Sequence, residues 1–153
     1  MRKSVLLTYI KIFIVIIIIA GLVYLGIKFF TKEYDSEAFE TVKTNLLLIQ
    51  SKTEVIAQKV EIEEEDAEYI GTKIDEKKDD QKIQNLINNN VIDIESEDSN
   101  YYCLDNNNLA ELELSDIQVD DYFIVDYEQN DIIYVDGIEN SEGNTVYKLS
   151  EME

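Results

Sequence analysis

A long run of apolar residues near the N-terminus constrains this chain more than any other feature. Ile12 to Ile27 is apolar without a break, and Phe29 and Phe30 extend the run past Lys28. As a helix, residues 12–30 would reach about 28 Å, which is enough to cross the hydrocarbon core of a bilayer. Lys28 can extend its ammonium group to the headgroups. The sequence therefore predicts a transmembrane helix over residues 12–30.

The charges on either side of this run predict its direction. Three basic residues precede it, whereas the two that follow are soon met by Glu33 and Asp35. The positive-inside rule then places residues 1–11 in the cytoplasm and residues 31–153 outside the cell membrane. A cleavable signal peptide is the alternative, and it needs a small-x-small site after a shorter apolar core. Ala20 and Gly21 lie inside the run, so we expect an uncleaved, single-pass anchor.

The charge of the remaining chain limits its partners. Residues 33–153 hold all 33 acidic residues but only eight of the 13 basic ones, which gives a net charge of −25. Such a surface repels phosphates, so we expect no nucleic-acid partner. The length of 153 residues suits one modest domain and an anchor.

The residue types present argue against catalysis and against a cofactor. The chain has no histidine and a single cysteine, Cys103, so it lacks a Ser-His or Cys-His pair, a histidine zinc site and an intrachain disulfide. Cys103 lies in an apolar, strand-like run and is expected to be a small buried side chain. We predict no enzyme activity, no metal, no cofactor and no small-molecule substrate. Calcium bound by acid-rich loops is an alternative, with oxygen ligands from Asp105, Asn107 and Glu111, or from Asp131 and Asp136.

After the apolar run, the sequence has the pattern of an amphipathic helix. Apolar side chains and one threonine recur at intervals of three and four residues: Phe39, Val42, Leu46, Ile49, Thr53, Ile56 and Val60. Asp35 or Ser36 is placed to cap the start. No proline or glycine occurs between Gly26 and Gly71, so we expect the membrane helix to continue into this one. The stripe either packs on its own domain or forms a coiled-coil seam.

The C-terminal third predicts a small antiparallel sheet. Residues 122–127, 132–136 and 145–149 are rich in β-branched and aromatic side chains and are joined by short turn sequences. Upstream, residues 101–104 have the composition of a strand, residues 73–81 that of an exposed loop, and residues 83–87 and 109–114 that of short helical segments. The predicted fold class is α+β, with the amphipathic helix packed on one face of the sheet.

This order of elements resembles that of type IV pilins and pseudopilins. Residues 42–59, VKTNLLLIQSKTEVIAQK, are similar to the first soluble helix of pilin-like proteins of Gram-positive bacteria. Residues 121–152 are similar to their final strands. The resemblance implies a pilin-like fold and an assembly role in a type IV pilus or a secretion system of the type II kind. Its implied partners are the membrane, other pilin-like subunits and the assembly machinery.

The cleavage motif of that family is altered here. Pilin precursors carry a glycine and then Phe-Thr-Leu-x-Glu, and Leu7 and Thr8 match this pattern, whereas Leu6 replaces the glycine and Lys11 the glutamate. The resemblance therefore implies an unprocessed subunit that stays anchored, with Leu7, Thr8 and Lys11 on its assembly helix. The alternative function is a membrane-tethered binding domain outside the cell, without a pilus role.

Overall fold

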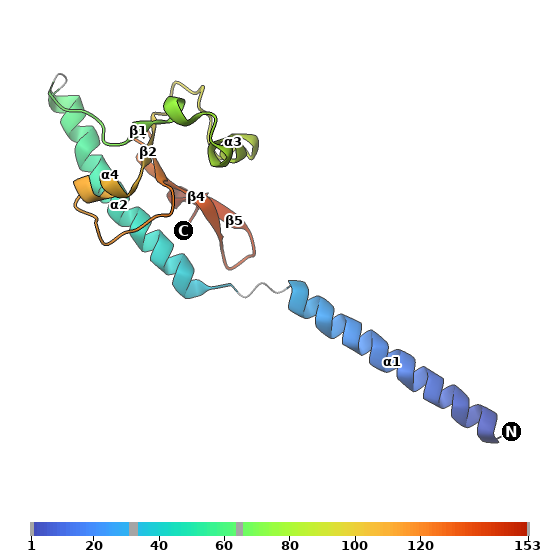
Figure 1. Cartoon of the computed structure of the whole chain (residues 1–153). Helices are drawn as coiled ribbons and strands as arrows, with labels where there is room; N and C mark the ends of the chain where they lie inside the picture. Colours follow the sequence, from blue (N-terminus) through green and yellow to red (C-terminus); the bar gives the residue numbers. More distant parts are fainter. Residues whose placement is uncertain (1, 31–33, 64–65, 153) are drawn as a thin grey trace. The chain divides into compact units, whose positions relative to one another are not determined.

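The computed structural model describes residues 2–30, 34–63 and 66–152, and the chain forms two compact units (Figure 1). The first is Met1–Tyr34 and the second is Asp35–Glu153, called the head below. Each unit has its own structure and is described separately.

The first unit is a single helix, α1 (Arg2–Phe30). Its stretch Val5–Tyr24 is 20 residues long and apolar enough to span a membrane, and a signal helix would have the same character. This stretch begins seven residues before the predicted span, because Val5, Leu6, Leu7 and Ile10 extend the apolar run beyond Lys11. The structure thus confirms an N-terminal apolar helix of membrane length.

The head begins with the amphipathic helix α2 (Ser36–Glu63). Asp35 caps it, since its carboxylate accepts a hydrogen bond of 3.0 Å from the Ala38 amide. The predicted continuation from α1 crosses residues 31–33, which lie outside the described residues. Tyr34 and Asp35 are not helical, so the expectation of one continuous helix is wrong at these two positions. The Asp35 carboxylate supplies the hydrogen-bond acceptor that a preceding helical turn would otherwise provide.

The sheet of the head has five antiparallel strands in the sequential order β1-β2-β3-β4-β5. The bounds are β1 (Thr72–Lys73), β2 (Tyr101–Leu104), β3 (Phe123–Asp126), β4 (Asp131–Glu139) and β5 (Thr145–Lys148). The predicted antiparallel meander is therefore confirmed for β3 to β5, and two earlier strands extend it. The register of β4 with β5 shifts between Ile133 and Ile138, near Gly137, whose φ is +66°.

Each face of the sheet has its own apolar core. Side chains such as Leu104, Val125 and Ile132 pack with Leu46 and Ile49 of α2 on one face. On the opposite face, residues that include Ile124 and Ile133 pack with short elements from the middle of the chain. These elements are η1 (Ile74–Lys77) and α3 (Gln81–Asn88). The sheet is thus covered on both faces, and the prediction that α2 would cover one of them is confirmed (Figure 1).

The segment predicted as an exposed loop, residues 73–81, is the main error in the secondary-structure prediction. It contains part of β1 and the 3-10 helix η1, and it buries Ile74. One apolar residue among eight polar ones is enough to fix the segment when the tertiary core provides a place for it. The short helix α4 (Asn106–Glu111) also begins three residues earlier than predicted, because Asp105 caps it through the Asn107 and Asn108 amides.

Candidate functional site

The predicted assembly residues lie on one face of α1. Leu7 and Thr8 precede Lys11 by four and three residues, which places the three side chains on neighbouring turns. The apolar side chains of Val5–Tyr24 are exposed in the structure, as they would be in a helix that meets lipid or other helices. Lys11 lies within this apolar stretch. An ionisable group at such a position calls for a carboxylate partner or access to the headgroups.

The predicted stripe of α2 points into the head. Phe39, Leu46, Ile49 and Thr53 are buried, and Val42 and Ile56 pack partly buried against the same core. Val60 is half-buried. The Thr53 hydroxyl donates to the Ile49 carbonyl at 3.0 Å, which satisfies the only polar side chain of the stripe. This stripe therefore lies against the sheet of its own chain.

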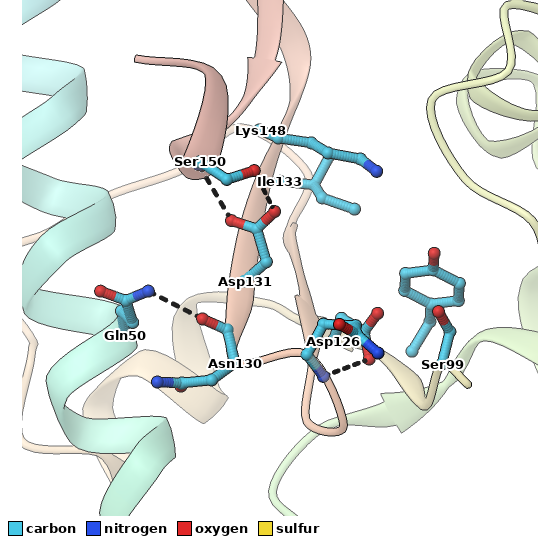
Figure 2. Close-up of a pocket in the computed structure, with 10 residues that line it drawn as sticks. Gln50, Ser99, Asp126, Asn130, Asp131, Ile133, Lys148 and Ser150 are labelled. Carbon is cyan, nitrogen blue, oxygen red and sulfur yellow. Dashed lines mark hydrogen bonds between the residues drawn. The ribbon is translucent and has the colours of Figure 1, made fainter. Parts of the chain in front are cut away.

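The head has a polar hollow of about 440 Å³ where β3 turns into β4 (Figure 2). It lies on the edge between α2, the strand-to-strand turn and the C-terminal residues. The lining residues are Gln50, Ser99, Tyr101, Asp126, Gln129, Asn130, Asp131, Ile133, Lys148 and Ser150. A small polar molecule would find several hydrogen-bonding groups together here.

Asp126 is the most buried charged residue of the hollow, with 3% of its surface exposed. One carboxylate oxygen accepts hydrogen bonds from the amides of Asn100, Glu128 and Gln129 at 2.9, 3.1 and 3.3 Å. Asp126 ends β3, so its side chain folds back over the turn that follows and holds residue 100 beside it. These three donors stabilise the buried charge.

Two further contacts close the hollow around the turn. Gln50 of α2 donates to the Asn130 carbonyl at 2.7 Å, and the Asp131 carboxylate accepts from the Ser150 amide and hydroxyl at 3.1 and 2.6 Å. Asn130 itself has a φ of +50°, a conformation that asparagine tolerates better than most residues. The turn is thus fixed to α2 on one side and to η2 (Leu149–Glu151) on the other.

Lys148 provides the cation of the hollow. Its ammonium group extends away from Asp131 in Figure 2, and it has no ion-pair partner among the described residues. The hollow therefore combines this one positive group with the carboxylates of Asp126 and Asp131 and with neutral polar groups such as the Tyr101 hydroxyl. The hollow thus offers hydrogen-bonding and charged groups to a polar molecule.

The residues considered for calcium do not form a site. Asp105 caps α4, Asp131 binds Ser150, and Asp136 binds Lys82 at 2.7 Å. Asp131 and Asp136 are five residues apart on β4, and each is already paired with a different element. Across residues 2–30, 34–63 and 66–152, no three or more cysteine, aspartate or glutamate side chains are gathered so that they could hold a metal ion.

Cys103 is buried with 1% of its surface exposed, and burial raises the pKa of its thiol to about 12. The thiol is therefore protonated and unreactive at neutral pH. Nearby, the Tyr122 hydroxyl is buried without a hydrogen-bond partner among the described residues, and burial followed by the Asp80 carboxylate raises its pKa. Both groups fill the core between the sheet and η1, as the sequence predicted for Cys103.

Sequence reasoning missed the hollow, although one signal points to it. Lys148 is the only basic residue after Lys82. It is therefore the single cation among the 71 residues 83–153, where acidic residues are frequent. Asp126 gives no such signal, because 33 acidic residues make any one of them inconspicuous. Its role depends on residue 100, which the fold brings to it from the start of a different strand.

Comparisons with family models, with characterised proteins and with solved structures find no match for this chain.

Proposed function

We propose that this chain is a membrane-anchored, pilin-like subunit with a structural role in an extracellular assembly, and that it keeps its N-terminal segment. The observation that carries the proposal is the order of its elements. An apolar helix of membrane length, α1, is followed by an amphipathic helix whose inner stripe packs along an antiparallel sheet. The resemblance of residues 42–59 and 121–152 to pilin-like proteins supports the same role.

The anchor supports assembly because it is apolar around its whole circumference. Side chains on different sides of α1, such as Ile12, Phe13 and Ile14, are all exposed. A helix of this kind can pack against several neighbours in a bilayer. In this proposal residues 1–11 remain in the cytoplasm and the acidic head lies outside the cell.

Lys11 places one positively charged group in the otherwise apolar anchor. In a bundle of apolar helices a buried ammonium group is stabilised by a carboxylate on a neighbouring helix. A glutamate at the corresponding depth of another pilin-like subunit would serve this purpose. We therefore propose that Lys11 directs this chain towards subunits that carry such a glutamate.

A photo-cross-linking residue at Ile17 tests the proposal in membranes of the native host. We expect a covalent adduct with a second protein that has an N-terminal apolar helix and an extracytoplasmic head, identified by mass spectrometry. The intact mass of the extracted chain should include the N-terminal basic segment. The matched control carries the photo-cross-linker at Ser141, an exposed residue in the turn between β4 and β5.

Two outcomes separate the parts of this proposal. Adducts with lipid alone, at Ile17 and at Ile19 on the opposite side of α1, would contradict the assembly role. Adducts that form equally well after Lys11→Glu would contradict only the pairing of Lys11. Removal of the first residues by a peptidase would contradict the permanent anchor and leave an ordinary filament subunit.

The second candidate is a membrane-tethered binding domain, which the polar hollow beside Asp126 and Lys148 favours. Its lining offers a carboxylate, an ammonium group and a hydroxyl to a small polar molecule. Under this reading α1 only holds the head at the membrane. The lipid-only adducts described above would make it the leading function.

A further inference from the structure

The outer face of α2, turned away from the sheet, has no charged side chain along 19 residues. Leu48, Val55 and Ile62 lie on it at intervals of seven, with 47%, 49% and 81% of their surfaces exposed. Thr44, Ser51 and Gln58 lie between them at intervals of three and four. In a head with a net charge of −24, an uncharged, partly apolar strip of this length marks a surface that meets another molecule.

Opposite charges border this strip. At 100° per residue, Glu54 and Glu61 lie along one side of it, with Lys43 before its start, and Lys52 and Lys59 lie along the other, with Glu63 after its end. These are the flanking positions that set partner choice in paired helices whose contact residues repeat every seven. Lys52 also binds Glu113 of its own chain at 2.9 Å, whereas Lys59, Glu54 and Glu61 have no ion-pair partner among the described residues.

We infer that the outer face of α2 binds the same face of a second copy of this chain, with the two helices parallel and in register. In that arrangement the acidic side of each helix meets the basic side of the other, so that Glu54 lies near Lys59 of the second copy. An antiparallel pair would place lysine against lysine and glutamate against glutamate. Charge complementarity therefore selects the parallel pair, the arrangement that two copies anchored in one membrane by α1 can form.

The pair is expected to be weak and to depend on the membrane. Three apolar residues and three neutral polar ones bury far less area than a stable soluble dimer requires. Anchoring raises the effective concentration of one copy near another, which compensates for the small contact. A groove of about 300 Å³ between α2 and α4, lined by Val55 and Lys59, gives room for side chains of the second copy. The inference does not rest on the pilin-like role, because a tethered binding domain would present the same face.

Disulfide cross-linking of the full chain in a lipid bilayer tests the inference. In a parallel pair Leu48 faces Leu48, so Leu48→Cys should give a disulfide-linked dimer under mild oxidation. In an antiparallel pair Leu48 would face Ile62 instead. Ser141→Cys, on the exposed turn between β4 and β5, measures the cross-linking that arises from random collisions. The native Cys103 is buried and protonated, so it contributes little to either variant.

Charge reversal provides the decisive comparison. Adding Glu54→Lys to Leu48→Cys should lower the dimer yield about tenfold, because two attractive contacts become repulsive. Adding Lys59→Glu as well restores opposite charges and should restore the yield. Circular dichroism checks that each variant keeps its fold, which exposed substitutions should not disturb. A dimer yield for Leu48→Cys no higher than that for Ser141→Cys would overturn the inference. A dimer yield that stays the same when Glu54→Lys is added would also overturn it.

Discussion

Asp126 organises the turn between β3 and β4 with one oxygen atom. Three amides donate to it, and one of them, at Asn100, belongs to the segment that leads into β2. The side chain thus joins two strands at their ends and orders the backbone that lines the hollow. A charge buried to this extent is stabilised only while those donors remain in place.

Removing this carboxylate should destabilise the head. We expect Asp126→Ala to lower the free energy of unfolding by about 3 kcal/mol, because three buried or half-buried amides lose their acceptor. Urea unfolding of residues 35–153, a compact unit with its own core, measures the effect. Glu128→Ala is the matched control, since Glu128 is exposed and its side chain accepts no hydrogen bond among those described; it should change the value by less than about 0.5 kcal/mol. Equal effects of the two substitutions would contradict the role of Asp126.

At the scale of single residues, burial could be predicted from the sequence and polar contacts could not. Cys103 and the α2 stripe follow from apolar neighbours at strand or helix spacing. The contacts of Asp126 with Asn100, of Lys82 with Asp136 and of Tyr127 with Ile70 join residues that are 26, 54 and 57 positions apart in the chain. Such partners are chosen by the topology, which local sequence patterns do not contain.

Among the elements, β1 is the shortest and depends on the chain that precedes it. Gly71 has a φ of +119°, and an added Cβ would lie 2.8 Å from the Cys103 carbonyl oxygen. Tyr127 supports the same segment, because its hydroxyl donates to the Ile70 carbonyl at 2.8 Å and its ring contacts Tyr69 and Tyr102. The backbone at residues 70–72 is therefore held tightly against β2.

Substitution of Gly71 tests how much this edge of the sheet contributes. Gly71→Ala should cost about 3 kcal/mol, because the new methyl group adds a backbone clash to an unfavourable φ. Gly143→Ala is the control: its φ is also positive, at +81°, but its nearest neighbour would be 3.8 Å away, so only about 1 kcal/mol is expected. Urea unfolding of both variants gives the comparison. If Gly143→Ala cost as much as Gly71→Ala, the backbone contact would not be the cause.

The predicted elements agree with the structure where local signals are strong. Strands β2 to β5 and helix α3 were predictable because the strands are rich in β-branched and aromatic residues and because turns that contain asparagine mark where the elements end. Strand β1 and η1 were missed because their polar residues conceal one core side chain, Ile74. The Asp35 cap was predicted, but the break before α2 was missed because neither proline nor glycine marks it. The hollow was missed because three separate segments assemble it.

For the molecule as a whole, alkaline pH should destabilise the head. Burial raises the pKa of Cys103 from 9.0 to about 12 and also raises that of Tyr127. Both groups stay protonated in the folded state at a pH where the unfolded chain has lost their protons. Their contribution is therefore complete below pH 9 and is lost as the pH rises above it.

We expect the free energy of unfolding to fall by about 1–2 kcal/mol between pH 8 and pH 10. Urea unfolding of residues 35–153 at the two pH values measures this change. Cys103→Ala removes the thiol and should leave a smaller fall, due mainly to tyrosine. A fall of the same size in this variant would show that Cys103 does not contribute.

Because the outer face of α2 is uncharged, the ionic strength of the solution affects how closely two heads can approach along it. Two heads that approach along this face meet neutral side chains, but each carries its large negative charge behind the contact. That repulsion extends over about 30 Å at 0.01 M ionic strength and over only about 8 Å at 0.15 M. A rise in ionic strength therefore allows neighbouring heads to approach each other more closely at an unchanged protein concentration. In the proposed pair, the ionic strength around the heads, as much as the amount of protein, sets how closely two copies approach.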